Sequence, residues 1–240
     1  MHPSLRERAG LCDLFDRLGP DATTRCDGWR TTELAAHLHT REHRLDAGPG
    51  LLGRGPFAAY TAKLEAKAAA RPYDQLVAEL RAGPPRQWFG RYVPAGDIHE
   101  WFVHHEDVRR ANGEEPRHDD DLDDALWGAL ARWGKVLTRK ADVGVELIAH
   151  DGRSRTAKEG DGPVVLRGRP GEIMLALFGR DSDSELEGSE AAGGVPRVHD
   201  RALTGPHWTH GQERPRDRPA ELLDRPRDRV LPGRLLQHRR

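Results

Sequence analysis

The spacing of apolar residues changes once along this 240-residue chain, near Lys140, and that change limits the fold more than any other feature. Before it, apolar residues recur every three or four positions, the spacing of one face of an α-helix. Glycine and proline pairs divide this part into segments. Four of the resulting helices are long enough for an antiparallel bundle. The predicted helices are Ser4–Leu18, Leu34–Arg44 (after an N-cap at Thr31), Phe57–Ala70, Asp74–Leu80, Asp97–Ala111 and Asp120–Lys140.

After Lys140 the apolar residues alternate with polar ones, the spacing of a half-buried strand. Asp151-Gly152 is a hairpin-turn pair between two such strands. The fold class is therefore α+β, with a helical bundle over 1–140 and a small α+β domain over 141–188. The predicted elements of that second domain are strands at Val143–Ala149, Arg153–Ala157, Val164–Leu166 and Ser184–Glu187, and a helix at Ile173–Phe178.

The last part of the chain, residues 189–240, has a different composition. Arginine, proline, glycine and histidine dominate it, and almost no periodic apolar pattern remains. Such a segment cannot bury enough apolar surface to offset the entropy lost on ordering, so we predict a disordered tail. Interleaved aspartates and a single aromatic residue, Trp208, argue against an RNA-binding arm.

Overall charge and composition exclude several classes of function. The chain has 38 basic and 39 acidic residues and a net charge of -1, which favours neither nucleic acid nor an anionic membrane surface. No run approaches the ~18–20 apolar residues that a membrane helix needs. The N-terminus lacks an apolar signal segment, and two cysteines make no disulfide framework. We expect a soluble cytoplasmic protein, monomeric or homodimeric.

One helix carries a pair of residues with metal-binding chemistry. Glu100 and His104 are four positions apart, so their side chains lie one above the other on the same helical face. A third candidate, His37, shares the inward face of an earlier helix with Leu34 and Leu38. Two imidazoles and one carboxylate, with a fourth position open, are the ligand set of a catalytic zinc site.

Each of these three residues also has an ordinary structural interpretation. A lone histidine on an apolar face, such as His37, is more often a satisfied core residue than a ligand. Asp97 and Glu100 have the spacing of a capping box, in which Glu100 would bond the backbone of Asp97. His104 and the neighbouring His105 can simply pack beside aromatic residues. The spacing alone does not decide between these alternatives.

Two motifs in this order resemble those of the DinB-like, mycothiol-dependent maleylpyruvate isomerase superfamily. The first is Gly28-Trp29-x-x-x-Glu33-Leu34-x-x-His37-Leu38, and the second is Glu100-x-x-x-His104-x-x-Asp107. The segment from Gly168 to Arg180 is similar to the C-terminal domain of those enzymes, which has a sterol carrier protein-like α+β fold. The resemblance covers roughly residues 4–188.

The resemblance implies a divalent metal, usually zinc, held by His37, Glu100 and His104. It also implies mycothiol, a low-molecular-weight thiol, as co-substrate and a small electrophile as substrate. A metal-bound thiol is deprotonated, and the thiolate is the nucleophile. Arg180 is a candidate for anchoring a substrate carboxylate through a bidentate pair, although it is equally well explained as a surface arginine after a helix. Asp107 orients a neighbouring group or caps locally.

The end of the chain departs from that family. Relatives are expected to continue past Gly188 with a short closing helix, and here an Arg/Pro/Gly segment replaces it. We hypothesise that the final ~50 residues are translated from a shifted reading frame, since high-GC codons read out of frame yield such a composition. A lost closing helix would expose core surface on the small domain.

Three functional hypotheses follow from the sequence. The first is a zinc- and thiol-dependent transferase or isomerase. The second is a metal-binding protein of the same fold without catalysis. The third is a helical interaction module in which the histidines and Glu100 are structural.

Overall fold

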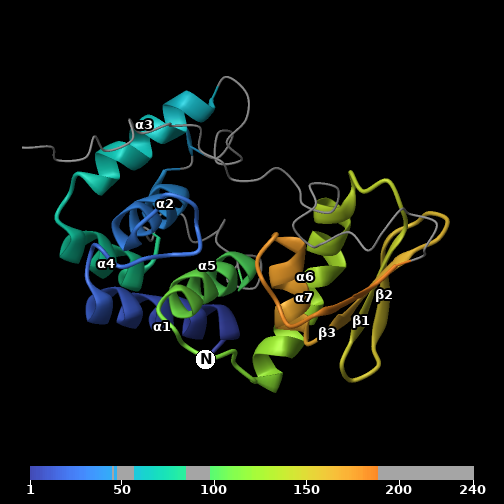
Figure 1. Cartoon of the computed structure of the whole chain (residues 1–240). Helices are drawn as coiled ribbons and strands as arrows, with labels where there is room; N and C mark the ends of the chain where they lie inside the picture. Colours follow the sequence, from blue (N-terminus) through green and yellow to red (C-terminus); the bar gives the residue numbers. More distant parts are fainter. Residues whose placement is uncertain (45, 48–56, 85–97, 189–240) are drawn as a thin grey trace, which may run out of the picture. The chain divides into compact units, whose positions relative to one another are not determined.

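The helices expected before residue 140 are present in the computed structural model of the chain, with bounds close to the predicted ones (Figure 1). The structure describes residues 1–44, 46–47, 57–84 and 98–188. Asp97, and with it the predicted capping box, lies outside these residues, as does the predicted tail. The helices are α1 (Pro3–Leu18), α2 (Thr31–His43), α3 (Ala58–Ala69), α4 (Tyr73–Ala82), α5 (Ile98–Ala111) and α6 (Asp120–Thr138).

Helices α1, α2, α4 and α5 pack around an apolar core of their own, and α3 packs on α2 through a smaller cluster. Helix α1 lies against α5 and α4, and α2 lies against α3 and α4. The side chains of this core are buried because α1, α2, α4 and α5 carry apolar residues at three- and four-residue spacing. The core includes Leu11, Phe15, Leu34, Leu38, Leu80, Trp101 and Val108. This packing agrees with the helical bundle expected for the N-terminal part.

The second part of the described chain is a mixed four-stranded sheet. Its strands are β1 (Val145–Ala149), β2 (Ser154–Lys158), β3 (Val164–Gly168) and β4 (Glu185–Glu187), in the order β2-β1-β3-β4. Strands β1 and β2 form the expected hairpin, with Gly152 at φ 89° in its turn. Strands β1 and β3 are parallel, and β3 pairs antiparallel with β4. The α+β class is therefore correct, whereas the sterol carrier protein-like assignment remains a prediction.

Helices α6 and α7 (Pro170–Leu177) pack against this sheet. Alternate residues of β1, namely Val145, Leu147 and Ala149, are buried, which is the pattern of a strand with one covered face. Leu126 and Leu130 of α6 belong to the same apolar cluster as the sheet. The predicted division of the chain at residue 140 stays a prediction.

Helix α5 is shared by both apolar cores. Trp101 and Val108 face the core of the first helices, whereas Ile98, Phe102 and Val103 face the core of the sheet. Ten of its residues are buried, so polar side chains on this helix are held inside protein and away from water. This position fixes Glu100 and His104, which lie on α5.

Several local predictions are wrong. The helical spacing of residues 57–70 predicts an inward Tyr60, but this residue is 42% exposed, because its hydroxyl bonds the carboxylate of Asp46 at the surface. The N-cap of α2 is Arg30, and Thr31 is the first helical residue, its hydroxyl donating to the carbonyl of Gly19. The sequence predicts Asp74 as the N-cap of the fourth helix, but α4 begins at Tyr73 and Asp74 lies inside it. His43, six residues after His37 and off its face, is predicted to be solvated, but it is half-buried and stacked on His39.

Candidate metal centre

Helix α5 holds Glu100 and His104 on one face, as the four-residue spacing predicts. The Nε2 atom of His104 lies 3.4 Å from Oε1 of Glu100. Glu100 is only 8% exposed, and the His104 side chain is 12% exposed. A carboxylate and an imidazole therefore meet in a place that water barely reaches.

Helix α2 brings His37 to the same carboxylate oxygen. The Nε2 atom of His37 lies 3.5 Å from Oε1 of Glu100. The rings of His37 and His104 meet edge to face, with centroids 5.6 Å apart. The three candidate ligand atoms all lie within 4.8 Å of one another. The structure thus brings together His37, Glu100 and His104, the set expected from the sequence.

The two distances from Oε1 of Glu100 to the imidazole nitrogens match the ligand spacing of a zinc site. Ligand atoms about 2.0–2.1 Å from a tetrahedral ion stand about 3.3 Å from each other. Oε1 of Glu100 is buried and accepts no hydrogen bond from the described residues. Burying a carboxylate oxygen without a hydrogen bond is costly, and a cation between it and the two imidazoles reduces that cost.

A second carboxylate stands behind each imidazole. Oε1 of Glu65, on α3, lies 2.8 Å from Nδ1 of His37. Oδ2 of Asp107 lies 3.1 Å from Nδ1 of His104. An ionised carboxylate only accepts, so it favours the tautomer with the proton on Nδ1. In that tautomer the lone pair is on Nε2, where a metal would bind. Carboxylate-backed histidines are the usual arrangement in metal sites.

The electrostatics of the triad favour a positive charge between the carboxylates. Burial acts to raise the pKa of Glu100, but Arg41, His104 and His37 outweigh it and hold this pKa well below its usual range. Burial acts to lower the pKa of His104, but its contacts with Asp107, Cys26 and Glu100 outweigh burial and hold this pKa well above the usual range. A proton or a metal cation would supply the positive charge that these carboxylates stabilise.

Arg41 gives the alternative without metal a physical basis. It lies one turn after His37 on α2, and its Nε atom is 3.4 Å from Oε1 of Glu100. A guanidinium at that distance partly neutralises the carboxylate. The geometry alone is therefore compatible with a structural ion-pair cluster, which metal analysis would distinguish from a metal site.

Asp107 connects the triad to the second part of the chain. Its two oxygens accept from Nε and Nη2 of Arg180, both at 2.9 Å. Burial acts to raise the pKa of Asp107, but Arg180 and His104 outweigh it and hold this pKa far below its usual range. Of the two roles considered for Asp107, orienting a neighbouring group is the one that the contacts support.

Cys26 is a site residue that the sequence reasoning missed. Its Sγ lies 3.1 Å from Oδ2 of Asp107, 3.7 Å from Nδ1 of His104 and 3.7 Å from Nη2 of Arg180. Burial and Asp107 raise the pKa of this thiol against the opposing effects of His104 and Arg180, so it is protonated and donates to Asp107. Cys26 lies in a loop, where no helical or strand periodicity predicts which way a side chain points. The only signal for it in the sequence is its position two residues before Gly28-Trp29.

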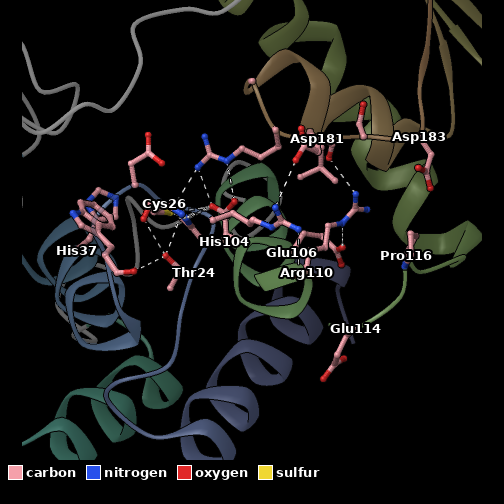
Figure 2. Close-up of a pocket in the computed structure, with 18 residues that line it drawn as sticks. Thr24, Cys26, His37, His104, Glu106, Arg110, Glu114, Pro116, Asp181 and Asp183 are labelled. Carbon is pink, nitrogen blue, oxygen red and sulfur yellow. Dashed lines mark hydrogen bonds and ion pairs between the residues drawn. The ribbon is translucent and has the colours of Figure 1, made fainter. Parts of the chain in front are cut away.

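A cavity of about 620 Å³ opens beside the triad. Figure 2 shows His37 at one end of it, Glu114, Pro116 and Asp183 at the other, and Cys26 and His104 between them. The volume is in the range of small-molecule sites. Arg180 also lines it, but its Nε and Nη2 atoms are turned to Asp107.

In the three other clusters of possible ligands among the described residues, arginines pair with the carboxylates. In the cluster of Cys26, His104 and Asp107, that arginine is Arg180. His39, His43 and Glu79 lie together, but Arg71 pairs with both oxygens of Glu79. Asp120, Asp123 and His150 form the other group, and Arg169 pairs with both of its aspartates. The triad around Glu100 is the cluster in which a carboxylate oxygen is buried without a hydrogen bond.

Comparison with known proteins bears on the fold. No protein-family model and no curated protein matches the chain. Two solved structures do, of the mycothiol-dependent maleylpyruvate isomerase and of a point mutant of it, with TM-scores of 0.52 and 0.53. In both cases the match has 17% identity and covers 80% of this chain and 90% of the other. The chain has the fold of that enzyme.

The likeness to mycothiol-dependent maleylpyruvate isomerase agrees with the resemblance seen in the sequence motifs. At 17% identity this likeness shows the fold alone, and the roles of individual residues are argued from the geometry of this chain. None of the helices in the described ranges is long and apolar enough to span a membrane.

Proposed function

We propose that the protein is a cytoplasmic zinc-dependent transferase or isomerase that uses a low-molecular-weight thiol, mycothiol, against a small electrophile. The observation that supports this most is Oε1 of Glu100, buried without a hydrogen bond and 3.4–3.5 Å from two imidazole nitrogens. The mycothiol dependence of the structurally similar enzyme suggests the co-substrate.

The residues present fit the metal that the fold suggests. His37, Glu100 and His104 would hold it, and three protein ligands leave a position open, as in catalytic zinc sites. When bound, a divalent cation there supplies charge that lowers the pKa of a thiol in the open position. His37 and His104 line the cavity, so a thiol lying in it is within reach of the triad.

The remaining residues orient and shield this centre. Glu65 and Asp107 contact Nδ1 of the two imidazoles, so that both Nε2 atoms face Oε1 of Glu100. The burial of α5 between two cores keeps water from Glu100. The anchoring of a substrate carboxylate by Arg180 remains a prediction, and its engagement with Asp107 competes with that role.

The test of this function is thiol-dependent turnover by the zinc-loaded protein. Free mycothiol and a panel of small electrophiles, maleylpyruvate among them, are followed with and without the protein. We expect product only when metal and mycothiol are both present, and none with the His37→Ala variant. Turnover at the same rate without the thiol would contradict the proposal.

A non-catalytic metal-binding protein of the same fold is the second candidate. It shares the triad and differs only in the absence of turnover. Bound metal without activity towards any electrophile in the panel would favour it. The third candidate, an interaction module without metal, is favoured by the contact between Arg41 and Glu100 and would be supported by a protein that takes up no metal.

A further inference from the structure

The wall of the cavity beside the triad carries an unusual balance of charge for a protein that would bind an acidic substrate. Carboxylates outnumber arginines on it two to one. The arginines are Arg25, Arg110 and Arg180, and the carboxylates are Asp27, Glu106, Asp107, Glu114, Asp181 and Asp183.

All three arginines are already paired with carboxylates of the protein. Arg180 holds both oxygens of Asp107. Arg110 donates from Nε to Glu106 at 2.7 Å and from Nη2 to Glu172 at 2.6 Å. A guanidinium that is already paired with one or two carboxylates binds an incoming anion weakly. The anion would have to displace a protein carboxylate, which would then be buried without this partner.

Arg25 is the most loosely held of the three. Its Nη1 lies 3.6 Å from Oδ2 of Asp181, and its side chain is half exposed. A ligand carboxylate that paired with Arg25 would displace Asp181 from that arginine. This exchange replaces one surface ion pair by another, so it adds little to the free energy of ligand binding.

Two of the carboxylates have no such partner. Among the residues that the structure describes, none forms an ion pair with Asp27 or Asp183, and both are exposed on the wall. By contrast, Glu114 pairs with Arg17 and Arg109 outside the cavity. The charge that the wall presents to a ligand is therefore negative at both of these positions.

We propose that this cavity selects a neutral or cationic substrate and disfavours a dicarboxylate, because its arginines are paired within the protein while Asp27 and Asp183 are not. The inference rests on the proposed function, since it names the class of electrophile that would meet the thiol. In this account Arg180 is a positioning residue for Asp107 and not an anion anchor.

The native thiol of Cys26 reports the potential inside the cavity directly. Methanethiosulfonates transfer their sulfenyl group to a cysteine thiolate, forming a disulfide and releasing methanesulfinate. The 2-aminoethyl reagent is cationic and the 2-sulfonatoethyl reagent is anionic. Their rates with the protein, measured by mass spectrometry and divided by their rates with free 2-mercaptoethanol, give a charge preference. Cys12 is fully buried and contributes little signal.

We expect the cationic reagent to be preferred by about tenfold or more over the free-thiol ratio at low salt, since charged clefts concentrate ions of opposite sign. Salt at high concentration should shrink the preference. Asp183→Asn and Asp27→Asn should each lower it, whereas Asp142→Asn, an exposed charge outside the cavity, should leave it unchanged.

Because Cys26 is half-buried, a second reporter is Ser182→Cys in a Cys26→Ser background, on the same wall. A preference for the anionic reagent at these reporters, or no preference, would overturn the inference, as would a preference that Asp183→Asn does not change. The readout needs no metal. A protein that binds no zinc would therefore contradict the proposed function without touching this result, and the reverse also holds.

Discussion

The residues of the candidate centre differ in how visible they are in the sequence. His37, Glu100 and His104 can be predicted as site residues, because helical spacing fixes the face on which each side chain lies. Glu65 cannot be predicted in this way, since α3 carries alanines around most of its surface and has no clear inward stripe. Yet Glu65 makes the shorter of the two carboxylate–imidazole contacts, 2.8 Å to His37.

Glu65→Ala should weaken metal binding without removing a ligand. Loss of a carboxylate behind a metal-bound histidine typically lowers affinity 10–100-fold, because the ring loses its orientation and part of its basicity. We expect a shift of that size in the zinc dissociation constant, measured by chelator competition. Lys67→Ala, an exposed change on the same helix, is the matched control and should have no effect. An unchanged constant in Glu65→Ala would show that this carboxylate does not support the site.

At the scale of elements, α5 determines where the site lies, because both of its faces are packed against apolar cores. The contact between α5 and α1 is close. A Cβ on Gly10 of α1 would stand 2.6 Å from Cε1 of His105, a distance that real contacts do not reach. His105 cannot move easily, since its Nδ1 bonds Oε2 of Glu7 at 2.9 Å.

Gly10→Ala should therefore destabilise the protein, although alanine is the better helix former. Overpacking costs about 1–3 kcal/mol, more than the helix propensity that alanine adds. Gly128→Ala on α6 is the control, because its Cβ would meet nothing within 4 Å and should stabilise by about 0.5–1 kcal/mol. Urea denaturation of both variants gives the comparison. Equal stabilisation by the two changes would contradict the packing described for α1 and α5.

At the scale of the whole described molecule, a buried ionic network ties α1 through α5 to α7. Glu7 of α1 accepts from His105 and from Arg117, and Arg117 also donates to Glu106. Glu106 in turn holds Arg110, whose guanidinium reaches Glu172 of α7. Removing one member takes hydrogen bonds from charged groups that stay buried, so the network stabilises the packing of these helices as a unit.

Glu7 makes the stability of the protein depend on pH in a defined window. Burial acts to raise the pKa of Glu7, but the hydrogen bonds from His105 and Arg117 outweigh it and lower this pKa from 4.5 to about 2. A folded-state pKa below the unfolded one stabilises above about pH 4.5, and this stabilisation is lost as the pH falls towards 2. Its size is on the order of 3 kcal/mol.

Glu7→Gln tests that window. Wild type should lose more free energy of unfolding than Glu7→Gln between pH 5 and about pH 3, as measured by urea denaturation. Other carboxylates titrate in both proteins, so the difference between them isolates Glu7. Glu146→Gln, on a strand away from the network, should follow wild type. Parallel pH profiles for wild type and Glu7→Gln would refute the assignment.

The order and class of the elements could be predicted from the sequence because their apolar spacing is regular, and the bounds agree to within a few residues. Contacts made by loops and by single polar side chains could not. Helical spacing predicts that Tyr60 points inward, but its hydroxyl contacts the ion pair of Arg44 and Asp46 at the surface. Cys26 lies in a loop and meets Asp107 only through the tertiary fold.

The central claim is that His37, Glu100 and His104 hold a metal ion. The measurement that tests it most directly is the zinc content of the purified protein, beside that of the His104→Ala and Glu100→Gln variants, by elemental analysis after dialysis. Circular dichroism of each variant confirms that it has folded. We predict about one equivalent of zinc in the wild type and almost none in either variant. A folded wild type without metal, or variants that retain it fully, would contradict the account.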